Sequence, residues 1–291
     1  MNSSVIASFA IVLIGSIACF PAAEAQTIKT LGSGFNGPHG VAVDGSGNVF
    51  VADTFNAAVK EILSADGYVT VKTLGSGFVS PEGVFIDGSN NVFVADGTSV
   101  KEILATGGYV TVNPIGSGGL RAPYGVALDG SGNIFVADFF GNSVKEMLAA
   151  SGYVTVNTIG SGFGVPSSVA VDSSGNVFVA DAGFSAVKEI LAAGGYVTVN
   201  TLGSGFSSPQ GVALDSSGNV FVADTNNNAI KEILAAGGYV TVNTIASGFN
   251  IPMGVAVDSS GNIFVADTGN GAVKEIIMAA TPVTLQSFYV Q

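Results

Sequence analysis

Short apolar segments alternate with short polar segments along this chain at a nearly fixed period. One copy reads PQGVALDSSGNVFVADTNNNAIKEIL, residues 209–234, and close copies return five more times. The aspartate that ends the first apolar segment recurs every 42 or 43 residues, at Asp44, Asp87, Asp129, Asp172, Asp215 and Asp258. A period this regular predicts a repeat architecture.

Each copy contains four segments with the pattern of β-strands. GVALD (211–215) is short and apolar, and residues 216–219 follow as a hairpin turn in which Gly218 supplies a positive φ. NVFVAD (219–224) is apolar on both faces, as expected for a strand covered on both sides. AIKEIL (229–234) makes a third strand, and YVTVNTI (239–245) makes a fourth with the polar alternation of an edge strand.

Four short antiparallel strands in about 43 residues are typical of a β-propeller blade, because each blade is one four-stranded sheet packed on the next. Six copies therefore predict an all-β fold of six four-stranded antiparallel blades. One phenylalanine recurs in every second strand, and we expect each to be buried between adjacent blades: Phe50, Phe93, Phe135, Phe178, Phe221 and Phe264.

The start of the repeat region predicts how the ring closes. Residues 27–35 match the fourth-strand segment of other copies, yet they precede the first complete copy. We therefore expect this N-terminal strand to pair with blade six, which begins at Pro252, since closure removes unpaired strand edges. The alternative is closure by residues 283–288, which match the repeat poorly.

The repeated motif P-x-G-V-A-V-D-x-S-G-N-V-F-V-A-D, followed by V-K-E-I, resembles the NHL repeat, whose members fold as such propellers. The resemblance covers residues 27 to about 280. Where the third strand of that family often carries an arginine, this chain has Ala58, Ser99, Ser143, Ala186, Ala229 and Ala272. The chain also lacks a basic stripe, so we expect no nucleic-acid binding of the kind that basic, RNA-binding NHL propellers show.

The first 25 residues have the pattern of a signal peptide. The apolar run at residues 5–20 is short for a membrane span, and a small-x-small cleavage signal, Ala23-Glu24-Ala25, follows it. We expect a signal peptide at 1–25, the propeller at 26–280, and a C-terminal tail or extra edge strand at 281–291. A retained anchor and lipidation at Cys19 are the alternatives. The expected location is periplasmic or secreted, with no membrane span in the mature chain.

Composition narrows the chemistry. Cys19 is the only cysteine and lies in the leader, so disulfides and cysteine metal sites are not expected in the mature chain. The formal net charge is −12. One Lys-Glu pair recurs in each blade, and we interpret these pairs as solvated strand faces. They begin at Lys60, Lys101, Lys145, Lys188, Lys231 and Lys274.

Two sets of aspartates recur in every copy. The first set is the period marker, and the second ends the second strand, at Asp53, Asp96, Asp138, Asp181, Asp224 and Asp267. We expect both sets to accept hydrogen bonds from backbone amides of the turn that follows each of them, and we expect no metal site there.

The connections between the fourth and first strands and between the second and third strands vary from repeat to repeat. In an up-and-down blade both connections emerge at the same end of the propeller. Loops on a rigid scaffold commonly build binding sites. These loops carry Phe55, Phe139, Phe140 and Phe184, at positions where solubility alone favours polar residues. The residues at the start of each first strand are expected to ring the channel mouth: His39, Glu82, Tyr124, Ser168, Gln210 and Met253. Drift in unconstrained loops is the alternative.

Blade three is expected to be the strongest sector of this face. Tyr124, Phe139 and Phe140 gather there with Arg121, the only arginine in the chain. Aromatic and arginine side chains often dominate interface energetics. The loop at Leu120 also has one extra residue, and Gly119 stands where other copies have phenylalanine. The alternative is that Leu120 fills the missing ring's place and Arg121 contacts only solvent.

The expected function is a non-catalytic, exported binding module with an unidentified protein, peptide or glycan partner on the variable loop face, and with no cofactor. Similar propellers include peptidyl-hydroxyglycine amidating lyases and streptogramin lyases, which depend on histidines. Because His39 is the one histidine here, a site of several histidines cannot be built, and these two activities are not expected. Gluconolactonase-type propellers use carboxylate and amide oxygens around a channel cation. The alternative is therefore a metal-dependent lactonase or lyase at the channel mouth, with Glu82, Gln210 and His39 contributing.

Overall fold

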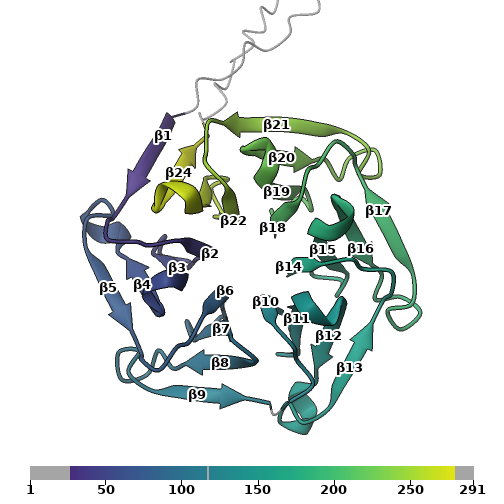
Figure 1. The fold of residues 1–291 in the computed structure, drawn as a ribbon, viewed down its shortest axis with the longest axis horizontal. Helices are drawn as coiled ribbons and strands as arrows, with labels where there is room; N and C mark the ends of the chain where they lie inside the picture. Colours follow the sequence, from purple (N-terminus) through teal and green to yellow (C-terminus); the bar gives the residue numbers. More distant parts are fainter. Residues whose placement is uncertain (1–26, 117, 279–291) are drawn as a thin grey trace, which may run out of the picture.

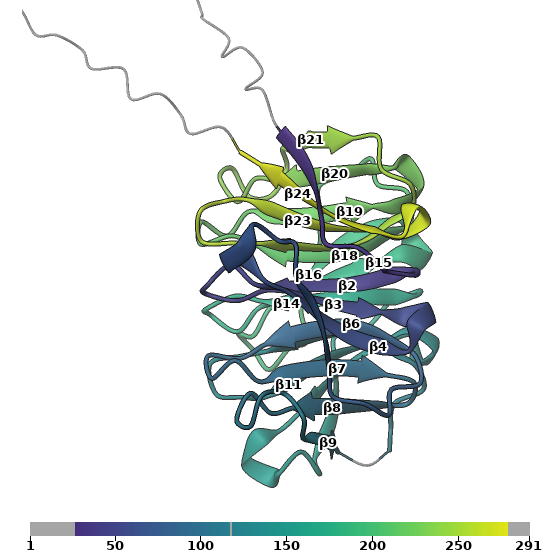
Figure 2. The ribbon, with the colours of Figure 1, turned by 90° about the vertical axis from the view of Figure 1, so that its left-hand side faces the viewer.

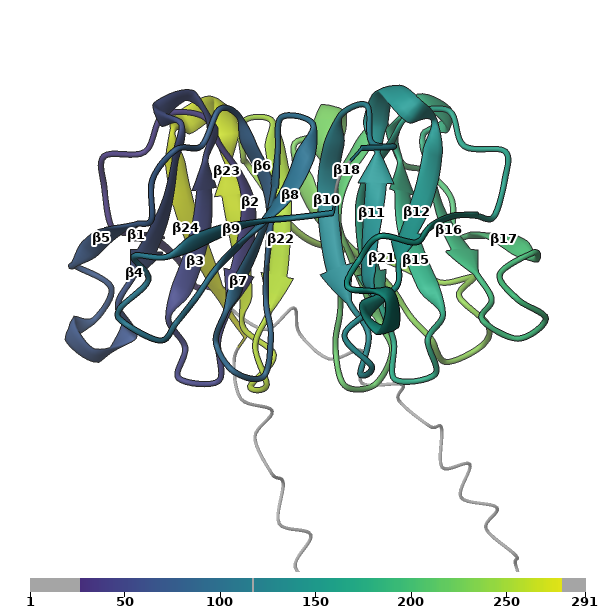
Figure 3. The same cartoon turned by 90° about the horizontal axis from the view of Figure 1, so that it is seen from below.

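The computed structural model describes residues 27–116 and 118–278, which form a closed ring of six four-stranded antiparallel sheets (Figure 1). The sheets pack side by side around the ring (Figure 2). Seen edge-on, the connecting loops gather at the two ends of the ring (Figure 3). The predicted fold class is confirmed. Within the described residues, no helix is long and apolar enough to cross a membrane.

The blades follow the chain order. Blade one contains β2 (Pro38–Val43), β3 (Val49–Asp53), β4 (Ala58–Ile62) and β5 (Val71–Leu74); blade two contains β6 (Pro81–Ile86), β7 (Val92–Asp96), β8 (Ser99–Ile103) and β9 (Val112–Ile115). Blade three contains β10 (Pro123–Leu128), β11 (Ile134–Asp138), β12 (Ser143–Met147) and β13 (Val156–Ile159); blade four contains β14 (Pro166–Val171), β15 (Val177–Asp181), β16 (Ala186–Ile190) and β17 (Val199–Leu202). Blade five contains β18 (Pro209–Leu214), β19 (Val220–Asp224), β20 (Ala229–Ile233) and β21 (Val242–Ser247); blade six contains β22 (Pro252–Val257), β23 (Ile263–Asp267), β24 (Ala272–Ile277) and β1 (Thr27–Leu31).

Short 3₁₀ turns connect some of these strands. Five of them lie between the second and third strands, namely η1 (Thr54–Asn56), η3 (Phe139–Gly141), η5 (Ala182–Phe184), η6 (Thr225–Asn227) and η7 (Thr268–Asn270). Two more, η2 (Ser64–Asp66) and η4 (Ala149–Ser151), follow third strands.

The N-terminal strand closes the ring, as predicted. β1 pairs antiparallel with β24, from Thr27 opposite Ile277 to Leu31 opposite Val273. Leu31 is fully buried in the core between blades six and one. The alternative closing segment, 283–288, and the predicted leader, 1–25, lie outside the described residues.

The recurring second-strand phenylalanines form the core between blades, as predicted. Their exposure ranges from 0% at Phe50 to 5% at Phe221. Several contact a tyrosine from the fourth-strand turn of the next blade; the rings of Phe50 and Tyr109, for example, are 5.9 Å apart. Each ring thus joins two sheets, so the core is continuous around the molecule.

The first aspartate set caps the first hairpin turn, as predicted. One carboxylate oxygen of Asp44 accepts hydrogen bonds from the backbone N–H groups of Ser46 and Asn48, both at 2.8 Å. Gly47 has φ +81°, and Asn90 takes the corresponding position in blade two with φ +64°. This turn is therefore framework in every blade.

The fourth strand begins later than predicted. In blade five it starts at Val242 rather than at Tyr239. Gly237, Gly238 and Tyr239 all have positive φ, so the turn extends through the tyrosine. The ring of Tyr239 packs against Phe178 of blade four, with centroids 5.7 Å apart.

The prediction of solvated Lys-Glu pairs was wrong. In five blades the lysine forms an ion pair with the buried aspartate that ends the second strand, and the lysine side chains are only 11–19% exposed. The glutamate beside each lysine is also largely covered; Glu189, for example, is 7% exposed. The physical reason is that a buried carboxylate is costly without a partner, and this lysine supplies one.

Candidate functional site

The variable end of the propeller is a set of loops tied together in pairs. In every blade, a backbone N–H in the connection between the second and third strands donates to a carbonyl of the loop that enters the blade. The pairs are Phe55 with Asn36, Gly97 with Ser80, Phe139 with Ala122, Ala182 with Val165, Asn226 with Ser207, and Gly269 with Asn250. The two variable connections therefore lie side by side at one end, as the blade topology predicts.

The second aspartate set holds these loops in place. Asp53 accepts a hydrogen bond from the backbone N–H of Asn36 at 2.7 Å and from Asn56 Nδ2 at 2.7 Å. Asp181 likewise accepts from the N–H groups of Gly164 and Val165. The predicted partner was the turn that follows each aspartate, but the backbone amides belong to the loop that precedes the blade. These buried carboxylates therefore fix the positions of the loops at the variable end through hydrogen bonds.

A β-bulge places the ring residues at the channel mouth. In blades two to six, one residue is inserted between the proline and the next paired residue, as between Pro123 and Gly125. The corresponding register shift in blade one lies between Pro38 and Val41. A bulge changes the direction of the side chains near it, so the residue after each proline does not follow the regular alternation of side chains along the strand. In blade four the residue after the proline is Ser167, which is buried; Ser168, the predicted residue, lies one position further along the strand.

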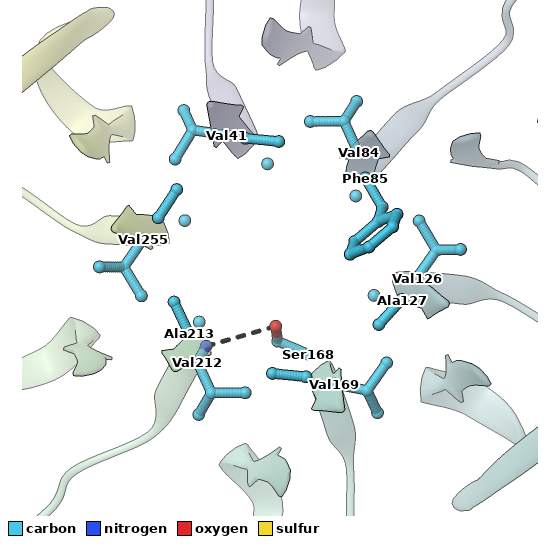
Figure 4. Close-up of a pocket in the computed structure, with 18 of the residues that line it drawn as sticks. Val41, Val84, Phe85, Val126, Ala127, Ser168, Val169, Val212, Ala213 and Val255 are labelled. Carbon is cyan, nitrogen blue, oxygen red and sulfur yellow. Dashed lines mark hydrogen bonds between the residues drawn. The ribbon is translucent and has the colours of Figure 1, made fainter. Parts of the chain in front are cut away.

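Glycine allows the inner strands to approach one another next to this bulge. A Cβ at Gly40 would lie 2.6 Å from Glu82 O, and one at Gly83 would lie 2.3 Å from Tyr124 O. Ser168 occupies the same position in blade four, and its Oγ accepts a hydrogen bond of 3.3 Å from Val212 N across the channel wall (Figure 4). Backbone contacts thus fix the mouth of the channel.

The channel inside this ring is mainly apolar. It has a volume of about 260 Å³, and the six first strands line it. The predicted ring residues all contribute to its lining, and Ser167 does so as well; they are His39, Glu82, Tyr124, Ser168, Gln210 and Met253. Figure 4 shows the ring of Phe85 beside Ala127 in this lining, where the other five blades carry alanine at the position of Phe85.

One polar chain crosses from blade one to blade two at the mouth. His39 Nδ1 makes a short contact with Glu82 Oε2, and the hydroxyl of Ser80 donates to Glu82 Oε1 at 2.7 Å. Both side chains of the first pair are about one-tenth exposed. Both oxygens of Glu82 therefore already have partners.

Gln210 lies at the same mouth in a different environment. Its Nε2 donates to Ser208 Oγ at 3.4 Å, whereas its Oε1 is buried without a hydrogen-bond partner among the described residues. Within residues 27–116 and 118–278, no group of three or more His, Cys, Asp or Glu side chains has the arrangement of a metal site.

Aromatic side chains form a cluster on blade three. The rings of Tyr124 and Phe139 stack with centroids 4.3 Å apart and planes at 22°, and Phe140 meets Phe139 edge-on at 5.1 Å. Burial, and secondarily the charge of Glu82, raise the pKa of the Tyr124 hydroxyl. Tyr124 therefore remains a neutral phenol at neutral pH and can donate a hydrogen bond.

Other candidate aromatics are spread around the same end. Phe55 and Phe140 are each 67% exposed, and Phe184 is 61% exposed. Phe55 meets His39 edge-on at 5.7 Å, and the Lys188 ammonium lies 4.7 Å from the Phe184 ring. These two rings flank blades one and four and do not join the blade-three cluster.

The entry loop of blade three departs from the other blades. Leu120 packs against the core between blades two and three, so it takes over part of the role of the missing phenylalanine. Arg121 is exposed and lines a cleft of about 320 Å³ with Ser80, Gly97 and Phe140. Ser80 and Gly97 were not among the predicted site residues; the signal that could have found them is the connection Gly97-Thr98, which is two residues shorter than its counterparts in the other blades.

Comparison with known proteins supports the fold. Residues 35–61, 206–233 and 249–276 match the family model described as NHL repeat, and these segments lie in blades one, five and six. No curated protein sequence matches the chain.

Several solved structures share the architecture. They include an auxiliary nutrient binding protein from Bacteroides thetaiotaomicron VPI-5482 (11% identity, 87% of this chain and 76% of that chain, TM-score 0.71). A gluconolactonase from Xanthomonas campestris is similar (13% identity, 87% and 90% coverage, TM-score 0.73). So is a catalytically inactive virginiamycin B lyase from Staphylococcus aureus with quinupristin (15% identity, 89% and 90% coverage, TM-score 0.63). At these identities the likeness shows the fold alone.

The solved neighbours thus include both binding proteins and enzymes, so they do not choose between the two functions. The matched repeats recur in a ring of six four-stranded blades. The chain is therefore a six-bladed β-propeller that contains NHL repeats.

Proposed function

We propose that this protein is a non-catalytic binding module that holds its ligand on the variable end of the propeller. The observation that carries the proposal is the exposure of three phenyl rings, Phe55, Phe140 and Phe184, in the loops of this one end. Exposed aromatic rings offer contact area for a ligand and cost solubility otherwise.

The opposite end also exposes apolar groups, but in a different way. Its turns carry a valine that is 75–77% exposed in five of the six repeats, at Val69, Val110, Val154, Val197 and Val240. A residue repeated in this manner belongs to the common framework of the blades. The phenyl rings instead occur in three blades only, so they mark particular sectors of the variable end.

The loops of the variable end are also pre-organised. Each is held by a backbone hydrogen bond to its neighbour loop, and buried aspartates such as Asp53 accept hydrogen bonds from the entry loops. A surface already fixed in place loses little conformational entropy when a ligand binds. This rigidity supports a binding role.

Export is part of the proposal, and it rests on the leader pattern of residues 1–25. Intact-mass analysis of the protein expressed in a bacterial host tests it. Cleavage after Ala25 is expected, whereas an intact N-terminus would leave the leader as an anchor.

The binding role is tested by presenting glycan and peptide arrays to the full chain. A triple variant, Phe55→Ala, Phe140→Ala and Phe184→Ala, is expected to lose the signals of the wild type. The matched control is Val69→Ala, Val154→Ala and Val240→Ala, which changes the opposite end. Signals retained by the phenylalanine variant, or absent from both arrays with the wild type, would contradict the proposal for these ligand classes.

A metal-dependent lactonase or lyase at the channel mouth is the second candidate. The unpartnered oxygen of Gln210 supports it, because an amide oxygen is a possible cation ligand. The fit is poor elsewhere, since His39 and Glu82 contact each other and no cluster of three ligand side chains occurs in the described residues. Calorimetric titration with Ca²⁺ and Zn²⁺, and an assay of lactone hydrolysis, test this candidate with Gln210→Ala as the variant.

A further inference from the structure

Two separate departures from the repeat meet in one cleft. The connection between β7 and β8 is only Gly97-Thr98, two residues shorter than the matching connection in the other blades. The entry loop of blade three has one residue more than the others. Residues of both loops line the same cleft, which we call the blade 2/3 cleft; its lining includes Ser80, Glu82, Gly97, Arg121, Tyr124 and Phe140.

The short loop uncovers this part of the surface. In blade one, the ring of Phe55 lies against the entry loop so closely that a Cβ at Gly37 would be 2.4 Å from it. In blade two, the nearest atom to a Cβ at Gly97 would be Val79 Cβ, at 3.9 Å. The connection in blade two thus carries no aromatic side chain to cover the entry loop, as Phe55 does in blade one.

The extra residue does not make the other wall loose. One oxygen of Asp138 accepts hydrogen bonds from the backbone N–H groups of Arg121 and Ala122, at 2.8 and 2.9 Å. Leu120, on the other side, packs into the core between the blades. The backbone of Arg121 is thus held on both sides while its side chain stays exposed.

The charges in the cleft favour an anionic ligand. His39 and Ser80 already contact the two oxygens of Glu82. Among the described residues, no carboxylate lies within ion-pair distance of the Arg121 guanidinium. The guanidinium is therefore the one cationic group in the lining of this cleft, it has no ion-pair partner among the described residues, and its planar fork suits a carboxylate.

We propose that the blade 2/3 cleft binds a carboxylated monosaccharide, such as a hexuronate; this inference rests on the proposed binding function. Arg121 pairs with the carboxylate, the Tyr124 hydroxyl hydrogen-bonds to a sugar hydroxyl, and Ser80 Oγ, whose proton is donated to Glu82, accepts a hydrogen bond from another. The exposed ring of Phe140 packs against the apolar face of the sugar. An amino acid could also pair its carboxylate with Arg121, but it fits less well because most amino acids lack the hydroxyl groups that Tyr124 and Ser80 would bind.

Calorimetry on the full chain with D-glucuronate, D-glucose and L-phenylalanine tests this inference. D-glucuronate is expected to bind at least about tenfold more tightly than D-glucose, since hydrogen bonds to charged groups are the stronger ones. Arg121→Gln should remove this preference, and Arg121→Lys should restore only part of it. Inserting two asparagines between Gly97 and Thr98 should block the site without touching the arginine.

The matched control is Phe55→Ala. Phe55 and Phe140 hold the same position in their repeats and are equally exposed, at 67%. Phe140→Ala should weaken D-glucuronate binding about tenfold, whereas Phe55→Ala should leave it unchanged. Equal affinity for D-glucuronate and D-glucose, a preference for L-phenylalanine, or no binding of the three probes would each overturn the inference. Array binding that the triple phenylalanine variant loses would still support the proposed function.

Discussion

The ammonium of Lys188 lies 2.7 Å from a carboxylate oxygen of Asp181, which is fully buried. The other oxygen of Asp181 accepts hydrogen bonds from the backbone of the loop entering blade four, at Gly164 and Val165. The same ammonium donates to Gly162 O at 2.6 Å and lies 5.2 Å from the ring centroid of Phe163. One lysine therefore joins a third strand, a buried acid and an inter-blade loop.

Replacing Lys188 by Met should lower the free energy of unfolding by about 3 kcal/mol, because Asp181 would keep a buried charge without its partner. Chemical denaturation measures the change. Lys145→Met is the matched control in blade three, since the Lys145 ammonium donates to Thr158 Oγ1 and forms no ion pair with Asp138 in the described structure. We expect the control to cost less than about 1 kcal/mol; equal losses would show that the ion pair contributes nothing.

Ring closure predicts a second stability difference, within a single strand. Leu31 is fully buried where β1 meets blade one, whereas Ile28 on the same strand is 44% exposed. Leu31→Ala should cost about 2–5 kcal/mol in the free energy of unfolding, since it leaves a cavity in the closing interface. Ile28→Ala should cost much less. A melting temperature that Leu31→Ala leaves unchanged would mean that β1 does not carry the closure.

The sequence was sufficient to predict the fold because the signals are local and repeated six times. The period gives the blade, the second-strand phenylalanines give the core, and the match of residues 27–35 to fourth strands gives the closure. The Lys-Asp pairs were missed for a simple reason: each lysine was read with its neighbouring glutamate. The useful signal was the pairing of the second and third strands. Asp53 lies opposite Ala58, and Lys60, two residues further along the third strand, lies opposite Val51.

The candidate site was predictable only in part. The sequence indicated the variable end and the residues of blade three, and the structure brings Tyr124, Phe139 and Phe140 into contact. It gave no sign of the bulge that turns the ring residues away from the sheet. Ser167 was missed for another reason: it directly follows Pro166, and the predicted residue was placed one position too late. The cleft also depends on Gly97 of blade two and Arg121 of the blade-three entry loop lining the same space, which no spacing along one repeat reveals.

The partly buried glutamates predict a pH dependence. Burial raises the pKa of Glu102, although a hydrogen bond from Asn113 opposes the shift. A folded-state pKa above the unfolded value means that the folded chain holds this proton more tightly. The contribution of Glu102 to the free energy of unfolding is therefore fully present below the unfolded pKa, and it is lost as the pH rises through the folded pKa.

The Glu102→Gln variant has no carboxyl group at this position and should not lose stability in this way. The difference in free energy of unfolding between the variant and the wild type, measured by urea denaturation, should therefore shift in favour of the variant between pH 4 and pH 7. Asp66→Asn is a control of opposite sign. Hydrogen bonds from Thr70 and Val69 lower the pKa of Asp66, so its contribution is present at neutral pH and is lost as the pH falls. A Glu102→Gln profile parallel to the wild type would contradict the assignment.

The glycine ring at the channel mouth predicts that one methyl group can disturb both stability and the site. A Cβ at Gly83 would lie 2.3 Å from Tyr124 O and 3.1 Å from the Cα of Gly125. These are backbone atoms of β10, which is paired with β11, so they cannot move aside like the end of a flexible side chain. Gly83→Ala should therefore cost about 1–3 kcal/mol in the free energy of unfolding. It should also displace Tyr124, which a changed near-ultraviolet tyrosine signal would report.

Gly88 provides the control in the same blade. It lies in the exposed turn after β6, and a Cβ there would meet no atom within 4 Å. Gly88→Ala should change the free energy of unfolding by no more than about 0.5 kcal/mol. Blade four carries a side chain at the position of Gly83, namely Ser168. This side chain accepts a hydrogen bond from Val212 N of the neighbouring inner strand. If Gly83→Ala proves as stable as Gly88→Ala, the inner strands have room to separate, and the mouth is not held by backbone contact.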